Sequence, residues 1–325
     1  MQRDFSRLNN QRFDLLVCGG GIYGAWTAYD AALRGLKVAL VDQGDWAGGT
    51  SSASSKLIHG GLRYLETYDF KLVKKALAER SMLLAAAPHR VWPLRFGVPL
   101  YAHGRIGSWR MKAGLTLYDL MAGKLGEGMH YRHFSAQEFS RRFPQLKTQG
   151  LQDGYTYADA QTDDARLVLE LVAGAQAAGA VCVNYCKVTG LIEVNGKASG
   201  ARLDDSLSHA RCEISAQQIV HTNGQWSTTA WEARNWSRLA KGVHLLLPDC
   251  GQQEALLLTS PGDGRVFFII PWYGRTLLGT TDTDYRGDLE RIAVEDADID
   301  YLLAAANAYL NRAWRHEDVI GSYAG

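Results

Sequence analysis

An apolar run from Phe13 to Cys18 opens the first clear pattern of the chain. Three glycines follow it, then a helix-forming stretch from Ile22 to Leu33, then a second apolar run from Val38 to Val41. Short apolar runs are typical of strands buried on both faces, and Gly35 suits the end of the intervening helix. The pattern predicts a βαβ unit.

Further along, a long helix is predicted from Asp69 to about Ala87, where Pro88 ends it. Its basic residues are most simply a solvated face: Lys71, Lys74, Lys75 and Arg80. The stretch 90–132 looks less regular. A helix within residues 161–180 takes Thr162 as its N-cap, and we prefer helix capping to catalysis as the role of Asp163 and Asp164.

Later apolar stretches predict strands, separated by turn residues. Residues 181–188 form one such stretch, on which Cys182 and Cys186 would share a face. The dipeptides Asn195-Gly196 and Tyr273-Gly274 predict hairpin turns. The other predicted elements are strands at 216–226, 265–272 and 275–282 and a helix at 295–310. Neither an internal repeat nor a low-complexity linker is present, which favours discontinuous domains.

Composition narrows the class of protein only modestly. The 325 residues are 46% hydrophobic, enough for a real core, and 35 basic residues balance 34 acidic ones, which gives no reason to expect nucleic acid. The five cysteines form no zinc pattern and are expected to be reduced, and we expect no metal. Without an apolar leader or a long apolar span, the protein is expected to be cytoplasmic or peripheral to a membrane.

Candidate chemistry begins at Gly19, Gly21 and Gly24, which form a GxGxxG motif between a strand and a helix. The first glycine permits a tight turn, the second lets the backbone approach a pyrophosphate, and the third lets helix and strand pack closely. Asp42 ends the second strand, where its carboxylate can accept hydrogen bonds from a ribose. This context predicts a dinucleotide site.

The choice between NAD and FAD depends on the residues after Asp42. An NAD dehydrogenase would normally continue with more βα units, whereas this chain enters the segment QGDWAGGTSSASSKLIHGGLRY at once. A long cofactor lying along such a segment would find hydroxyls and backbone N–H groups for its pyrophosphate and ring edge. The segment favours FAD.

Five motifs follow one another along the chain: DLLVCGGGIYGAWTAYDAALRGLKVALVD, TSSASSKLIHGGLRYLETYDF, TDDARLVLE, IIPW and LLGTTDTDYRGD. With these motifs in this order, the chain resembles the FAD-dependent, aerobic-type glycerol-3-phosphate dehydrogenases. The resemblance implies an α/β fold in which an FAD-binding Rossmann-like domain (10–75 and 150–228) is interrupted by a mixed, largely antiparallel substrate-binding domain (76–149 and 229–325). It also implies oxidation of sn-glycerol 3-phosphate to dihydroxyacetone phosphate, with electrons passed to a quinone.

The resemblance also implies site residues. Those expected to bind FAD are Gly19, Gly21, Ile22, Tyr23, Gly24, Asp42, Thr50, Ser51, Ser52, Ser54, Ser55, Lys56, Gly60, Gly61, Val188 and Gly224. Those expected at the catalytic centre are His59, Arg63 and Tyr64.

Several of these roles have ordinary alternatives. His59 is the candidate base for the substrate hydroxyl, or a loop histidine in a common hydrogen bond. Arg63 would bind the substrate phosphate through its planar fork, or form a surface salt bridge. Lys56 would offset negative charge on the reduced flavin, or cap a carbonyl. Gly60 and Gly61 would let the backbone approach the ring closely.

Three departures from the family pattern stand out. HTNGQW replaces the usual Asn-Ala-Thr/Ala-Gly-Pro-Trp run and keeps only Gly224 and Trp226. Tyr23 and Trp26 are bulky beside the glycine turn. The chain stops at GSYAG, before the family's next arginine and its glycine-lysine-rich return to the flavin, so we expect a truncated chain and a poor catalyst.

Two other functions compete with glycerol 3-phosphate oxidation. The alternatives are another FAD-dependent amine or amino-acid oxidase, and a truncated flavin-fold remnant with little activity.

Residues 90–132 carry seven basic residues against the acids Asp119 and Glu127, a local charge of +5. The interleaved aromatics are Trp92, Phe96, Tyr101, Trp109 and Tyr118. This segment could dock on an anionic membrane surface, on the cytoplasmic face of an inner membrane, or form an aromatic core with a basic rim. The oligomeric state is left open.

Overall fold

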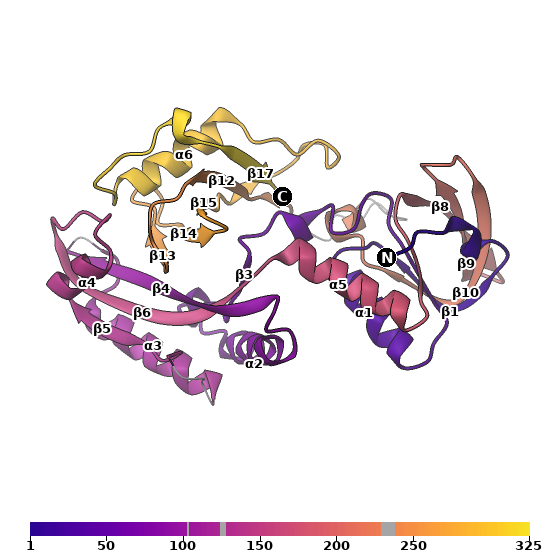
Figure 1. Cartoon of the computed structure of the whole chain (residues 1–325), viewed down its shortest axis with the longest axis horizontal. Coiled ribbons are helices and arrows are strands. Elements are labelled where there is room, and N and C mark those ends of the chain that lie inside the picture. The colour runs from indigo at the N-terminus through magenta and orange to yellow at the C-terminus, as the bar shows by residue number, and fades with distance from the viewer. Residues whose placement is uncertain (103, 124–127, 229–237) are drawn as a thin grey trace. The chain divides into compact units, whose positions relative to one another are not determined.

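The computed structural model describes residues 1–102, 104–123, 128–228 and 238–325. The chain divides into two compact units. Unit 1 comprises Met1–Ser54 with Asp163–Leu239, and unit 2 comprises Ser55–Thr162 with Ala240–Gly325 (Figure 1). The expected first domain therefore extended too far at 55–75 and 150–162, because those segments pair with each other inside unit 2: Leu57 lies opposite Gln161 and Ile58 opposite Ala160. Residues 229–237, at the expected second boundary, lie outside the described residues.

Unit 1 is built on one sheet with strand order β7-β2-β1-β10-β9-β8. Its strands are β1 (Arg12–Cys18), β2 (Val38–Val41), β7 (Val181–Val183), β8 (Cys186–Val194), β9 (Lys197–Asp205) and β10 (Arg211–His221). β7, β2, β1 and β10 run parallel, and β9 and β8 continue antiparallel. Helices α1 (Ile22–Leu33) and α5 (Asp164–Ala177) lie side by side and share a buried cluster with β1 and β2. The predicted βαβ unit is confirmed.

Two local expectations in unit 1 are wrong. Residues 181–188 are not one strand, because Tyr185 takes a positive φ of 51° and separates β7 from β8; Cys182 and Cys186 thus lie on different strands. The N-cap of α5 is Asp163 rather than Thr162, since the Asp163 carboxylate accepts from Arg166 N at 3.2 Å. The Asn195-Gly196 turn is confirmed by φ values of 54° and 72° between β8 and β9.

Unit 2 has a large mixed sheet of order β17-β12-β15-β14-β13-β4-β6-β3, with β5 beside β6. Its strands are β3 (Leu57–Ile58), β4 (Val91–Tyr101), β5 (Arg132–Ser135), β6 (Leu151–Thr162), β12 (Val243–Pro248), β13 (Ala255–Thr259), β14 (Val266–Trp272), β15 (Arg275–Gly279) and β17 (Gly321–Ala324). Of these pairs, β13 with β4 is parallel and the others are antiparallel. A separate short pair joins β11 (Ala240–Lys241) to β16 (Thr283–Asp284).

Helices cover both faces of this sheet (Figure 1). They are α2 (Phe70–Ala86), α3 (Ser108–Ala122), α4 (Ala136–Arg142) and α6 (Asp296–Asn307). Because successive strand residues point to opposite faces, Ile269 joins the cluster of α4 and α6 while Ile270 joins that of α2 and α3.

Residues 90–132 are more regular than expected. They contain β4 and α3, and the alternating Leu94, Phe96, Val98 and Leu100 are buried although Pro93 and Pro99 interrupt the strand pattern. In α2, the expected solvated face includes Lys71, Lys74 and Lys75, which are exposed, but Arg80 is only 1% exposed. Arg80 therefore belongs to the interior of unit 2.

Candidate functional site

The glycine turn of unit 1 leaves no room for larger residues. Gly19 has a φ of 111°, and a Cβ there would lie 2.5 Å from Thr222 O. A Cβ at Gly24 would overlap Gly19 O, so the third glycine allows α1 to pack against the turn. At Gly21, the N-cap of α1, a Cβ would meet only Ser51 Oγ, at 3.1 Å, and Ser51 Cβ. Gly19 and Gly24 thus have the geometric roles that the motif predicts, while the role of Gly21 toward a pyrophosphate stays a prediction.

Asp42 connects the turn to the loop that follows β2. Its carboxylate accepts from Gly20 N at 2.5 Å and from Gly44 N at 2.8 Å. Burial raises the pKa of this carboxyl, and the two hydrogen bonds oppose that rise. Cys186 N donates to Asp42 O at 2.7 Å, which places the start of β8, two residues before Val188, beside this acid.

Hydroxyls of the serine-rich segment contact the N-termini of both α1 and α5. Ser51 Oγ accepts from Ile22 N at 2.9 Å within a short 3₁₀ turn at Thr50–Ser52. Ser54 Oγ donates to Asp164 at 2.6 Å, a contact that sequence reasoning missed when it assigned that acid to capping alone. Tyr23 is 79% exposed, so its ring does not fill the glycine turn.

The departure HTNGQW also has a structural explanation. Thr222 Oγ1 donates to Cys18 O at 3.0 Å and to Gly19 O at 2.9 Å, which ties the end of β10 to the glycine turn. Gly224 has a φ of 53° and begins a 3₁₀ turn. The polar side chain of Thr222 therefore stabilises the glycine turn.

Unit 2 holds the rest of the predicted site residues, beginning with Ser55 and Lys56. Lys56 is 7% exposed, and its Nζ lies 5.0 Å from the centre of the Tyr323 ring and 5.9 Å from that of Trp272. Ser55 Oγ lies 2.8 Å from Nε2 of His244. Sequence reasoning missed His244, since a single histidine in an apolar strand carries no local signal.

His244 is enclosed on every side. It is 2% exposed, it stacks on Tyr323 with ring centres 4.9 Å apart, and its Nδ1 has no hydrogen-bond partner among the described residues. Burial, helped by the positive charge of Lys56, lowers its pKa to about 3. His244 is therefore neutral at neutral pH.

The loop between β3 and α2 carries His59, Arg63 and Tyr64, which are all exposed. The Arg63 guanidinium lies 5.8 Å from the centre of the Tyr64 ring, and Gly61 takes a φ of 72°. Gly60 is buried, and a Cβ there would overlap Leu77 and the Tyr118 hydroxyl. Packing inside unit 2 is thus one reason for glycine at this position.

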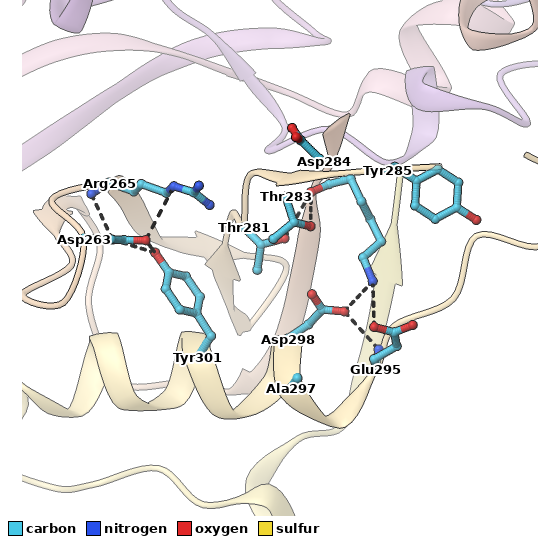
Figure 2. A pocket seen from close by; sticks show the side chains of 11 residues that line it. Asp263, Arg265, Thr281, Thr283, Asp284, Tyr285, Glu295, Ala297, Asp298 and Tyr301 are labelled. Carbon is cyan, nitrogen blue, oxygen red and sulfur yellow. Dashed lines mark hydrogen bonds and ion pairs between the residues drawn. The ribbon is translucent and has the colours of Figure 1, made fainter. Parts of the chain in front are cut away.

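A pocket of about 490 Å³ lies elsewhere in unit 2 (Figure 2). None of the predicted site residues lines it. Ion pairs lie among its lining residues: Lys241 Nζ lies 2.7 Å from Asp298, and Arg265 Nε lies 3.5 Å from Asp263, which also accepts from Tyr301 OH at 3.1 Å. No cluster of metal-ligating side chains occurs in the described part of the chain.

The chemistry of the predicted residues fits FAD. Unit 1 offers a glycine turn and a helix N-terminus with a neighbouring hydroxyl, which suit a pyrophosphate, and a fixed carboxylate, which suits a ribose. Unit 2 offers a buried lysine and aromatic rings at the continuation of the same segment.

Comparison with known proteins agrees with this fit. Residues 14–325 match the FAD dependent oxidoreductase family, and the chain belongs to it. It is 39% identical over 342 residues to a glycerol-3-phosphate dehydrogenase of Synechocystis sp., covering 99% of this chain and 62% of that one. It is 36% identical over 335 residues to an alpha-glycerophosphate oxidase of Streptococcus pyogenes, covering 98% and 54%.

Among solved structures, the glycerol-3-phosphate dehydrogenase from Bacillus halodurans complexed with FAD matches with a TM-score of 0.81 and 32% identity, over 98% of this chain and 57% of that one. The expected resemblance, the fold class and FAD as cofactor are confirmed. The chain spans little more than half the length of these relatives.

Proposed function

We propose that this chain oxidises sn-glycerol 3-phosphate to dihydroxyacetone phosphate. The observation that carries the proposal is identity of 36–39%, across almost the whole chain, to enzymes named for glycerol 3-phosphate. FAD, when bound, supplies the acceptor for the hydride that leaves C2 of the substrate.

The residues of this chain have complementary tasks in that reaction. Arg63 binds the phosphate through its fork, and His59 accepts the hydroxyl proton as the C2 hydride leaves. His244, with a pKa of about 3, is a poor base, so it serves instead as a neutral hydrogen-bonding group beside Ser55. Lys56 provides positive charge near the rings of Tyr323 and Trp272.

Anaerobic addition of glycerol 3-phosphate to the purified, FAD-loaded chain tests this function. We expect the visible flavin absorbance to bleach, and to stay unchanged with glycerol or with amino acids. Bleaching by glycine or proline instead would support an amine or amino-acid oxidase, and no bleaching by any of them would support a flavin-fold remnant.

We propose separately that a membrane quinone accepts the electrons from the reduced flavin. Relatives named oxidase as well as dehydrogenase make dioxygen the natural alternative. Stopped-flow reoxidation of the reduced flavin by a soluble quinone and by oxygen would compare the two. Faster reoxidation by oxygen at matched concentrations would contradict the quinone proposal.

We propose further that the protein is cytoplasmic and docks peripherally on an anionic membrane surface through α3. Trp109, Arg110 and Lys112 are exposed there, whereas Phe96 and Tyr118 are buried; Lys124 and Glu127 lie outside the described residues. No helix of the described residues is long and apolar enough to cross a bilayer. Equal sedimentation with neutral and anionic vesicles at low salt would contradict electrostatic docking.

A further inference from the structure

A buried ion pair contacts the loop that carries His59 and Arg63. Arg80 of α2 and Asp159 of β6 are each 1% exposed, and Arg80 Nη1 lies 2.5 Å from Asp159 Oδ1. The same Nη1 also donates to Ala158 O at 2.9 Å. Asp159 and Arg80 are 79 residues apart in the sequence, so only the fold brings them together.

Asp159 accepts more than the arginine. Tyr118 of α3, itself 1% exposed, donates its hydroxyl to Asp159 with 2.9 Å to each carboxylate oxygen. Gly60 N donates to Asp159 Oδ1 at 3.2 Å. A guanidinium, a phenol and a backbone N–H from three different elements therefore converge on one carboxylate.

This convergence determines where the loop lies. Leu77, the Tyr118 hydroxyl and the Asp159 carboxylate surround Gly60, so the position of its backbone is restricted. His59 precedes Gly60 directly, and Arg63 follows three residues later in the short 3₁₀ turn Leu62–Leu65. An anchor at Gly60 therefore acts on both exposed groups at once.

The surroundings of Asp159 act on its charge in opposite directions. Burial is the largest effect and leaves the pKa of Asp159 raised, while Arg80, His59 and the hydrogen bond from Tyr118 oppose that rise. Since all three neighbours that contact the carboxylate are donors, the charged form is the one the site accommodates. A buried carboxylate with this many partners is rigid, because moving it leaves a charge unpaired.

We propose that Asp159, held by Arg80 and Tyr118, is a positioning residue that fixes the Gly60 N–H and thereby orients His59 and Arg63 toward the substrate. The orienting part of this inference rests on the proposed function, whereas the anchoring part does not. A displacement of about 1 Å in reacting groups can lower a rate about 100-fold, so loss of the anchor should reduce turnover without removing a catalytic side chain.

The test compares two double variants that both remove the buried charges. Arg80→Met with Asp159→Asn keeps an acceptor opposite Gly60 N, and Arg80→Met with Asp159→Leu removes it. Neutralising both partners avoids an unpaired buried charge, so both variants should fold, as thermal unfolding and flavin content would verify. Tyr118→Phe alone serves as a milder control, because two of the three donors remain.

The first measurement uses no substrate. Hydrogen exchange of the peptide containing residues 57–63 should show a protected Gly60 amide in the wild type and in the asparagine variant, and about 10-fold or more faster exchange in the leucine variant. Equal exchange rates of the Gly60 amide in the two double variants would overturn the proposal that Asp159 anchors Gly60.

The second measurement is flavin reduction by glycerol 3-phosphate. The leucine variant should reduce its flavin about 10- to 100-fold more slowly than the asparagine variant at equal FAD content. Equal rates despite faster exchange would overturn the orienting role. A wild type that glycerol 3-phosphate does not reduce would reject the proposed function instead, while the exchange result would still decide the anchor.

Discussion

The glycine turn of unit 1 and the His59 loop of unit 2 position their functional groups in different ways. In unit 1, glycine allows two backbone segments to approach closely, because a Cβ at Gly19 or Gly24 would overlap the neighbouring backbone. In unit 2, Gly60 is held by a buried carboxylate that needs a cation and a phenol from distant helices. The contact between Gly24 and Gly19 is local in sequence, although Gly19 also meets Thr222 from the end of β10. The arrangement around Gly60 exists only in the folded chain.

Breaking the distant arrangement should have the largest effect. Arg80→Met leaves Asp159 buried without its cation, which should lower the free energy of unfolding by about 3–5 kcal/mol. Lys74→Met on the exposed face of the same helix should change it by less than about 0.5 kcal/mol. Urea unfolding measures both, and a similar loss in the two variants would mean that Arg80 has no special role.

A second effect in unit 2 depends on pH. The pKa of His244 is lowered to about 3 in the folded chain, against 6.5 in the unfolded one, so the unfolded state binds more protons between these values. The stabilising contribution is complete above pH 6.5 and is lost as the pH falls toward 3, by at most about 1.4 kcal/mol per pH unit.

Thermal unfolding between pH 7 and 4 measures this contribution. His244→Gln keeps a group that can hydrogen bond to Ser55 but cannot titrate, so its stability should vary less with pH than that of the wild type. Parallel curves for the two proteins would show that His244 does not titrate across folding.

Breaking the local arrangement should cost less stability but should remove the cofactor. Gly24→Ala forces a Cβ against Gly19 O, which should destabilise unit 1 by about 1–3 kcal/mol and distort the pyrophosphate site. Gly44→Ala is the matched control, since its Cβ would meet only Asp42 Oδ1 at 3.7 Å. The ratio of flavin to protein after gel filtration should fall for the first variant alone; equal flavin retention would place the pyrophosphate elsewhere.

The features that the sequence could predict divide in the same way. The βαβ unit and the turns Asn195-Gly196 and Tyr273-Gly274 depend on neighbouring residues, and the structure confirms them. β4 was missed because two prolines hide its alternation, and Arg80 was assigned to solvent because its partner is encoded 79 residues away. His244 gave no local signal, since its burial depends on Ser55 and Tyr323 from opposite ends of unit 2.

The smallest expected effect is that of replacing Gly114, a glycine that no close contact requires. Gly114 lies inside α3, and a Cβ there would meet nothing within 4 Å. Glycine in a helix interior costs about 0.5–1 kcal/mol relative to alanine, because it has more conformational freedom to lose on folding. Gly114→Ala should therefore raise the stability of unit 2 by about that amount and leave flavin content unchanged, which differential scanning calorimetry and absorbance would measure. A loss of stability would mean that α3 needs the glycine for close packing, as the turn of unit 1 does.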